Sequence, residues 1–247
     1  MTEAPVPGPV PRFELTEWRS EFGVVAGITG RGEGPAPFDL GLAGTHAPVG
    51  QVLDRWRSLQ SALPEFSGMV VSRQLHGTRI LEHESGRGFT ILEGADGHFT
   101  RQPGLLLAVT VADCIPVYLL DPLNRVAMLL HAGWRGVAGG ILEQGIARLV
   151  ARGGLVDKLL VHCGIGICGQ CYEVGPEVFA GCGVAPPPGG KGSLDLRAKL
   201  HEQALHAGVD RVSTSPFCSR HDGPLFFSHR GSGGSDGRMV AYLGLLR

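Results

Sequence analysis

The stretch from Leu105 to Gly136 reads LLLAVTVADCIPVYLLDPLNRVAMLLHAGWRG and contains three apolar runs separated by short polar breaks. The run at 105–111 has the length and the β-branched content of a strand that is buried on both faces. The runs at 117–120 and 126–130 flank the sequence DPLN, which is typical of a turn. The glycine-rich sequence HAGWRG then leads into a helix. We therefore expect neighbouring buried strands followed by a helix.

Apolar periodicity indicates further elements elsewhere in the chain. Helical spacing of leucine, isoleucine, valine and tryptophan predicts helices at 49–63, 142–150 and 194–206. Short apolar runs predict strands at 69–71, 159–163, 225–228 and 239–246. Because these strands and helices are mixed without strict alternation, the pattern favours an α+β protein with mixed sheets.

The composition is that of a globular chain rich in loops. Of 247 residues, 43% are hydrophobic, which allows a sizeable core in one large domain or two small ones. The 39 glycines and 17 prolines indicate many loops, but the hydrophobic fraction is too high for a disordered chain. Six cysteines are too few for a disulfide scaffold, so they are candidate ligands, nucleophiles or packing residues.

Charge and hydropathy exclude several classes of partner. The chain has 22 Lys and Arg against 23 Asp and Glu, a balance that disfavours binding to nucleic acid or to an anionic membrane. No apolar run reaches the roughly 18 residues of a membrane span. The sequence MTEAPVPGPVP at 1–11 lacks the pattern of a signal peptide, and we expect it to form a flexible tail. These features predict a cytoplasmic protein. They leave its oligomeric state open.

Three residues that follow or end predicted strands are potential metal ligands. They are His76 in QLHG, Cys114 in VADC and His131 in HAGWRG. Two imidazoles and a thiolate suit Zn²⁺, and three protein ligands leave a fourth position open, as in a catalytic zinc site. The spacing of the three residues matches no local zinc motif, so a packed cysteine and two unrelated histidines also fit the pattern.

An ordered set of short motifs connects the chain to a known family. The motifs are QLHG at 74–77, GADG at 94–97, VADCIPV at 111–117, HAGWRG at 131–136, YEVG at 172–175, FFSHR at 226–230 and DGRM at 236–239. In order and approximate spacing they resemble the YfiH/laccase-domain family. Its members were first described as multicopper polyphenol oxidases and later as zinc-dependent purine nucleoside phosphorylases.

The resemblance implies a fold, an activity and a metal site. It implies a four-layer α/β/β/α arrangement, related to the cytotoxic-necrotizing-factor cysteine hydrolases, in one catalytic domain over residues 12–247. It implies phosphorolysis of adenosine, inosine, guanosine and methylthioadenosine, together with deamination of adenosine. The family's metal ligands correspond to His76, Cys114 and His131, so the substrates would be purine nucleosides and phosphate and the cofactor Zn²⁺.

Phosphorolysis needs an anion site, and the guanidinium group suits phosphate oxygens. Arg135 lies in a glycine-rich junction before a helix, where backbone N–H groups also favour anions. Arg31 and Arg230 match family arginines. The chain departs from the family pattern beside these residues, because Gly30 and His229 replace the usual threonine and tyrosine.

Deamination needs a proton shuttle, usually a carboxylate. Asp96, Asp113 and Glu173 lie within the matching motifs. Asp96 is the candidate catalytic carboxylate. Asp113 directly precedes Cys114, and on a strand it would point to the opposite face, which favours a supporting role.

The remaining cysteines receive other interpretations. Cys163, Cys168, Cys171 and Cys182 superficially resemble a four-cysteine zinc site. Their gaps of 4, 2 and 10 residues are irregular, however, so packing is favoured over structural zinc. Cys218 matches a family cysteine for which packing or a place in the wall of the site is expected.

Four other functions compete with the nucleoside phosphorylase. A copper polyphenol oxidase would use the same ligands, but Met128, the nearest methionine, would face away from His131 on a strand. A cysteine hydrolase would use Cys114 as nucleophile and His131 as base. A hydrolase that edits peptidoglycan precursors would use the same site with a larger ligand. A non-enzymatic binding module would not depend on any one ligand.

Overall fold

The predicted strand at 105–111 is β8 (Leu105–Val111), an interior strand of a seven-stranded mixed sheet. The computed structural model describes residues 1–34, 36–42 and 47–247, and within these ranges the strand order of this first sheet is β1-β2-β3-β15-β8-β4-β6. Its other strands are β1 (Ala4–Val6), β2 (Arg12–Glu14), β3 (Val24–Thr29), β4 (Gly68–Arg73), β6 (Gly88–Glu93) and β15 (Met239–Leu245). The structure thus confirms the strands predicted at 69–71, 105–111 and 239–246.

The other two apolar runs of the opening stretch form a hairpin in a second mixed sheet. They are β9 (Ile115–Asp121) and β10 (Val126–Ala132), which pair antiparallel so that His131 lies opposite Pro116. The order of this six-stranded sheet among the described residues is β14-β11-β9-β10-β7-β5. Its remaining strands are β5 (Ile80–His83), β7 (Gly97–Thr100), β11 (Leu160–Cys163) and β14 (Arg211–Thr214).

Three connections carry the chain from the first sheet to the second at one edge of the molecule. Strands β6, β4 and β8 are parallel neighbours, so their carboxyl ends lie at the same edge. The loops that follow them, at 74–79, 94–96 and 112–114, lead into β5, β7 and β9 of the second sheet. Motif residues far apart in the sequence are therefore brought together at this edge.

The two sheets pack face to face around a shared core. Val109 and Met239 of the first sheet and Leu120 and Leu129 of the second belong to one buried cluster. A buried hydrogen bond crosses it, because the Tyr118 hydroxyl donates to the backbone oxygen of Gly27 at 2.8 Å.

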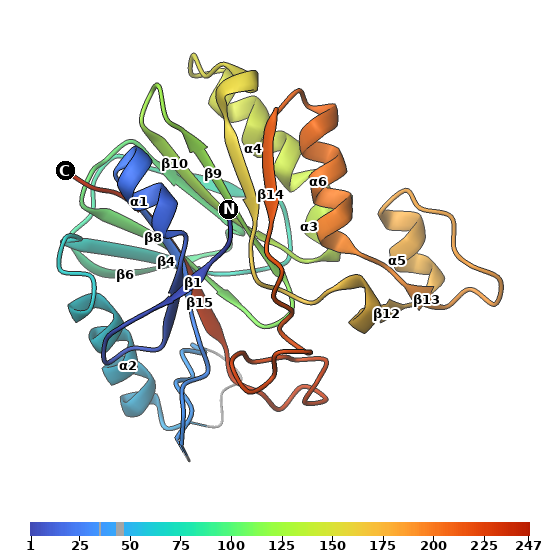
Figure 1. Ribbon diagram of the computed structural model, residues 1–247, viewed down its shortest axis with the longest axis horizontal. Coiled ribbons are helices and arrows are strands. Elements are labelled where there is room, and N and C mark those ends of the chain that lie inside the picture. Colours follow the sequence, from blue (N-terminus) through green and yellow to red (C-terminus); the bar gives the residue numbers. More distant parts are fainter. Residues whose placement is uncertain (35, 43–46) are drawn as a thin grey trace.

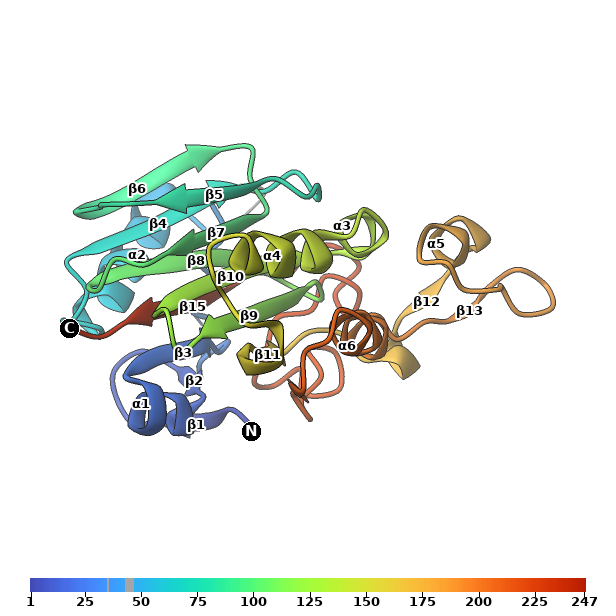
Figure 2. The same ribbon diagram turned by 90° about the horizontal axis from the view of Figure 1, so that it is seen from above.

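Helices cover the outer face of each sheet, as Figures 1 and 2 show. Helix α2 (Val49–Ser61) packs Trp56 and Leu59 against the first sheet. Helices α3 (Trp134–Ala138), α4 (Ile141–Val150) and α6 (Leu196–His206) pack on the second sheet, with Asp195 capping the first turn of α6. The three predicted helices are confirmed, with their ends shifted by a few residues.

The remaining short elements lie at the periphery. They are α1 (Thr16–Phe22), α5 (Pro176–Gly181), β12 (Glu173–Val174), β13 (Gly192–Ser193) and the 3-10 helices η1 (Val156–Lys158) and η2 (Gly169–Cys171). In both ribbon views α5 projects from the rest of the chain together with β12 and β13. Within the described part of the chain, no helix is long and apolar enough to cross a membrane.

Two segments differ from what the sequence predicts. The region 1–11, expected as a flexible tail, contains β1, which pairs with β2, and it buries the Glu3 carboxylate against His162 at 3.0 Å. The strand predicted at 225–228 is wrong, because this segment forms turns. There the backbone N–H of Ser228 donates to the Asp236 carboxylate instead of to a neighbouring strand.

Candidate active site

His76, Cys114 and His131 converge at the edge where the chain passes between the sheets. One potential ligand atom from each of the three side chains lies within 4.8 Å of the other two. His76 follows β4, and Cys114 directly precedes β9. His131 lies near the end of β10, and the antiparallel β9–β10 register places this end beside Cys114. The hairpin therefore places Cys114 and His131 side by side.

The Asp96 carboxylate holds His76 and His131 in place by hydrogen bonds. Its Oδ1 accepts hydrogen bonds from the backbone N–H of His76 and from Nδ1 of His131, both at 2.9 Å. Its Oδ2 accepts the backbone N–H groups of Leu75 at 3.1 Å and Gly77 at 2.8 Å. Because Nδ1 of His131 is engaged, Nε2 is the nitrogen left for Cys114 or a metal ion. The structure therefore gives Asp96 the geometry of a positioning group.

These contacts set the charges of the buried groups. Burial raises the pKa of Asp96, but hydrogen bonds from His131 and from the backbone of Gly77 and Leu75 outweigh it, so the pKa is lowered. Burial also raises the pKa of the Cys114 thiol, yet the nearby imidazoles of His131 and His76 lower it to about 6. Burial lowers the pKa of His131, whereas the Cys114 thiolate and Asp96 raise it to about 9. The cluster thus favours a thiolate beside an imidazolium.

Backbone geometry brings the three side chains close. A Cβ atom on Gly133 would lie 2.9 Å from Cδ2 of His76 and 3.1 Å from Sγ of Cys114, so only glycine fits there without displacing them. His76 and Asp113 adopt positive φ values of 58° and 81°. Such values are strained for residues other than glycine and persist where surrounding contacts enforce them.

The cluster faces a pocket of about 750 Å³. The rings of Trp134 and Tyr172 and the side chains of Arg135 and Arg230 contribute to its walls. The Arg135 guanidinium lies 4.4 Å from the centre of the Trp134 ring, and that of Arg230 lies 5.1 Å from the centre of the Tyr172 ring. Among the described residues, no acidic side chain forms an ion pair with either arginine.

Arg31, the third arginine predicted for this site, does not line the pocket. Both oxygens of the Asp236 carboxylate accept hydrogen bonds from its guanidinium at 2.9 Å. The same guanidinium lies 4.9 Å from the centre of the Phe227 ring. Its charge is thus compensated away from the pocket.

Asp113 connects Cys114 to the C-terminal part of the chain. Its carboxylate accepts hydrogen bonds from the hydroxyls of Ser219 at 2.6 Å and Ser228 at 2.7 Å, and from the backbone N–H of Arg230 at 2.6 Å. It supports the site as expected from the sequence, but it does so from a bend with positive φ and not from a strand.

Sequence reasoning missed several residues of the pocket. Arg73, Gln74, His229 and Arg238 also line it. The Arg73 guanidinium pairs with Glu93 at 2.7 Å, and that of Arg238 donates to the backbone oxygens of Asp236 and Gly237. Gln74 and Arg238 lie within the quoted motifs QLHG and DGRM, which was the available signal. Glu173, like Arg31, does not line this pocket, although its backbone oxygen accepts a hydrogen bond from Arg230.

A half-buried thiol between two imidazoles, one of them held by a carboxylate, is the arrangement of an enzyme's reactive centre. A match of the sequence to a family of enzymes supports this interpretation. Residues 34–246 match the model of the family described as multi-copper polyphenol oxidoreductase laccase. The chain belongs to this family, the one that its ordered motifs resemble.

Several relatives match over most of the chain. The protein named purine nucleoside phosphorylase YlmD, from Geobacillus stearothermophilus, is 32% identical over 247 residues, covering 90% of each chain. The protein named adenosine deaminase RL5, from an unknown prokaryotic organism, is 33% identical and covers 76% of this chain and 79% of its own. The crystal structure of YlmD from Geobacillus stearothermophilus superposes with a TM-score of 0.89 at 30% identity, covering 99% of this chain and 100% of that one.

Proposed function

We propose that this chain is a zinc-dependent purine nucleoside phosphorylase that also deaminates adenosine. The observation that carries the proposal is the convergence of His76, Cys114 and His131 within 4.8 Å beside a pocket. Two arginines of that pocket, Arg135 and Arg230, form no ion pair with an acidic side chain of the described residues. The names of the relatives YlmD and RL5 support the two activities. We propose adenosine, inosine, guanosine and methylthioadenosine as the substrates.

The residues of the cluster fit a zinc ion. Two imidazole nitrogens and one thiolate are borderline-soft ligands of the kind that Zn²⁺ prefers, and three protein ligands are typical of a catalytic site. Gly133 leaves room for His76 and Cys114 to approach each other. Asp96 fixes the ring of His131 by its Nδ1 hydrogen bond, a support commonly found behind a metal-binding histidine. When bound, zinc supplies a Lewis acid at this edge of the pocket.

The walls of the pocket supply the groups that a nucleoside and phosphate require. Arg135 and Arg230 offer guanidinium groups that can donate two parallel hydrogen bonds to phosphate oxygens. Trp134 and Tyr172 offer flat faces against which a purine can stack. Phosphorolysis forms a bond between a phosphate oxygen and C1′ of the ribose and breaks the bond from C1′ to the purine. The purine leaves with the electron pair of that bond and takes up the proton that monohydrogen phosphate gives up. The arginines hold the attacking anion, and the imidazole of His131 remains oriented by Asp96 throughout.

We also propose that residues 12–247, together with the strand β1 that pairs with β2, form one catalytic domain with the four-layer α/β/β/α arrangement. The sheet-to-sheet core supports the two inner layers. The packing of α2 on one sheet and of α4 and α6 on the other supports the two outer layers.

The proposal is tested by measuring metal content and then assaying a panel of purine nucleosides with and without phosphate. Arg135→Ala should weaken phosphorolysis by about 1.5–3 kcal/mol, roughly 10- to 100-fold, because one charge-assisted contact is lost. Deamination of adenosine needs no phosphate and should change less. Arg19→Ala serves as the control, because Arg19 lies on α1 and its side chain forms an exposed ion pair with Glu65. Equal loss of both activities in Arg135→Ala would instead indicate a structural role for this arginine.

Copper chemistry receives less support from the donor set. A blue-copper site adds a distant methionine to two histidines and a cysteine. Met128 belongs to the cluster between the second sheet and its helices, whereas Ala127 and Leu129 face the other sheet. Alternate residues of a strand share a face, so His131 lies on the same face of β10 as Ala127 and Leu129. Met128 therefore points to the opposite face.

A cysteine hydrolase is the second candidate, because Cys114, His131 and Asp96 also have the order of a nucleophile, a base and an orienting carboxylate. Alkylation distinguishes the two. A zinc-bound Cys114 should react slowly in the metal-loaded protein and rapidly after chelation. A free nucleophile should react rapidly in the loaded protein, and its activity should survive chelation. Mass spectrometry of Cys114 labelling, with and without chelator, measures the difference.

A further inference from the structure

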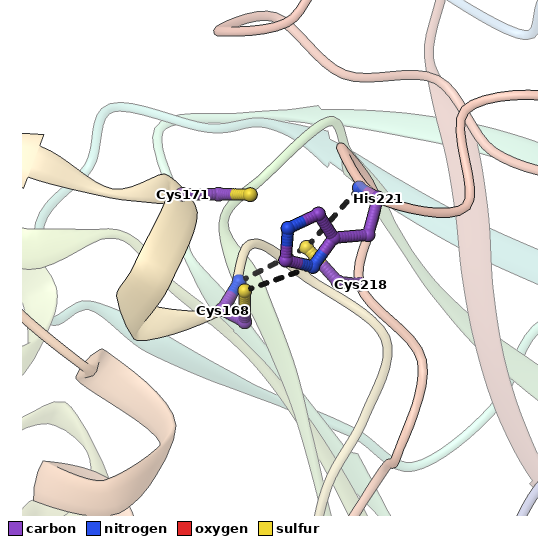
Figure 3. Close-up of side chains that lie close together, drawn as sticks. All are labelled: Cys168, Cys171, Cys218 and His221. Carbon is purple, nitrogen blue, oxygen red and sulfur yellow. Dashed lines mark hydrogen bonds between the residues drawn. The ribbon is translucent and has the colours of Figure 1, made fainter.

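A second cluster of potential metal ligands lies apart from the three residues discussed above. Its members are Cys168, Cys171, Cys218 and His221, shown in Figure 3. Cys168 precedes the 3-10 helix η2 and Cys171 is its last residue, whereas Cys218 and His221 lie at the start of the segment that leads to the FFSHR motif. A parallel bridge between Gly166 and Cys218 holds the two segments together.

The four side chains point toward one another. One ligand atom from each lies within 4.8 Å of the other three. Nδ1 of His221 lies 3.5 Å from Sγ of Cys168. In a tetrahedral zinc site, bonds of about 2.0–2.3 Å place the ligand atoms roughly 3.5–4 Å apart. Small side-chain movements are therefore enough to close the cluster around one ion.

The backbone around Cys218 is arranged to stabilise a thiolate. Its Sγ accepts the backbone N–H of Cys168 at 3.3 Å and that of His221 at 3.5 Å. Its own N–H donates to the Asp222 carboxylate at 2.8 Å, which fixes the turn. Hydrogen bonds from N–H groups to a thiolate are favourable because they compensate its charge.

The sequence spacing agrees with this arrangement. Cys168 and Cys171 form a C-x-x-C pair, and Cys218 and His221 form a C-x-x-H pair. Two such pairs brought together are the ligand pattern of structural zinc sites. All four members of the earlier four-cysteine grouping are free thiols, but Cys163 and Cys182 belong to the core beneath α6 and α5. The sequence analysis favoured packing for these cysteines, because the other two potential ligands lie about 50 residues further along the chain.

Simple packing explains this cluster less well. Cys171 and Cys218 do pack with the buried Ile167. The cluster also contains the exposed imidazole of His221, however, whose ring nitrogen faces a thiol. An exposed histidine adds nothing to an apolar core, whereas it completes a set of four ligands and leaves a path for an ion to enter.

We propose that Cys168, Cys171, Cys218 and His221 bind a structural Zn²⁺ ion, distinct from the metal of the catalytic site. Four protein ligands close the coordination shell, so this ion would have no open position for substrate. It would tie together two segments that build one wall of the catalytic pocket. Ile167 and Tyr172, on either side of the C-x-x-C pair, line that pocket, and Ser219 donates a hydrogen bond to Asp113.

Metal analysis of the full-length chain tests the proposal. After incubation with zinc and removal of the excess, the wild-type chain should retain about two zinc ions. Cys218→Ser and His221→Ala should each retain about one, with the affinity of the second ion reduced by more than about 100-fold, because a direct ligand is lost. His221 is exposed, so His221→Ala is expected to fold even if Cys218→Ser does not. Cys182→Ser, which replaces a buried thiol outside the cluster, is the matched control and should retain about two.

Substitution at the catalytic site separates this proposal from the proposed function. Cys114→Ser should remove the other zinc ion and leave the ion at the four-ligand cluster. Cobalt-loaded Cys114→Ser should then show strong thiolate-to-cobalt absorption from three cysteines, and His221→Ala should alter that spectrum in the double variant. The proposal is overturned if His221→Ala and Cys218→Ser both bind as much zinc as the wild type. An intact mass that reveals a disulfide in place of the metal would overturn it as well.

Discussion

Replacing Asp96 by asparagine tests whether one carboxylate organises the catalytic cluster. Each oxygen of Asp96 accepts two hydrogen bonds: Oδ1 from His76 N–H and His131 Nδ1, and Oδ2 from Leu75 N–H and Gly77 N–H. Asparagine keeps only one of these oxygens and replaces the other with a donor. Whichever way the amide turns, two donors lose their acceptor and face an NH₂ group.

The magnitude follows from those two losses. A buried donor left without a partner costs about 1–3 kcal/mol, so Asp96→Asn should lower the free energy of unfolding by about 2–6 kcal/mol. The loss of support for His131 should also weaken zinc binding by about 10- to 100-fold, the usual effect of changing a group that holds a metal ligand. That weakening corresponds to about 1–3 kcal/mol of binding free energy.

The assay combines urea unfolding of the metal-free chain with a zinc titration against a chromophoric chelator. Asp121→Asn is the matched control, because Asp121 is equally buried and accepts the backbone N–H groups of Leu123 and Asn124. It lies at the opposite end of β9 from Cys114. Asp121→Asn should therefore reduce stability and leave zinc affinity unchanged. If Asp96→Asn also binds zinc as tightly as the wild type, the positioning role of Asp96 is refuted.

Two further predictions concern steric fit and pH. In Gly133→Ala the new Cβ would press on His76 and Cys114, so the free energy of zinc binding should weaken by about 1–3 kcal/mol in a zinc titration. Gly50→Ala is the control, because a Cβ at Gly50 meets open space, and its zinc affinity should be unchanged. Burial lowers the pKa of His98 to about 3, so the folded chain keeps it neutral while the unfolded chain binds a proton below about pH 6.5. Stability is therefore fully present above pH 6.5 and is lost as the pH falls toward 3, by at most about 1.4 kcal/mol per pH unit. Urea unfolding between pH 7 and 5 should give a shallower dependence for His98→Gln, and identical slopes would contradict this origin.

The elements predicted best are those whose burial is uniform. The apolar run at 105–111 is a strand with nearly every residue buried, because helix and sheet cover its two faces. The proximity of Cys114 and His131 followed from a hairpin with a recognisable turn. Such local signals act over a few residues and can be read directly from the chain.

The features that the sequence did not reveal depend on distant partners. The break at 112–114 looks like an ordinary connection, yet it moves the chain from one sheet to the other. Arg31 matches an arginine of the family pattern, which suggested a place in the pocket. Its guanidinium instead pairs outside the pocket with Asp236, 205 residues away in the chain. His221 was not assigned to any site, because two of its three companions, Cys168 and Cys171, lie about 50 residues earlier in the chain. No local periodicity reports on these pairings.

The hydrogen bonds of Asp113 have a consequence for protein engineering. A single carboxylate next to Cys114 anchors Ser219, Ser228 and the backbone of Arg230. Exchanging the segment that carries these serines between relatives, in order to transplant substrate preference, would therefore also shift Cys114. A chimera should inherit the segment together with its aspartate, and a loop designed in isolation should keep a hydroxyl at both serine positions.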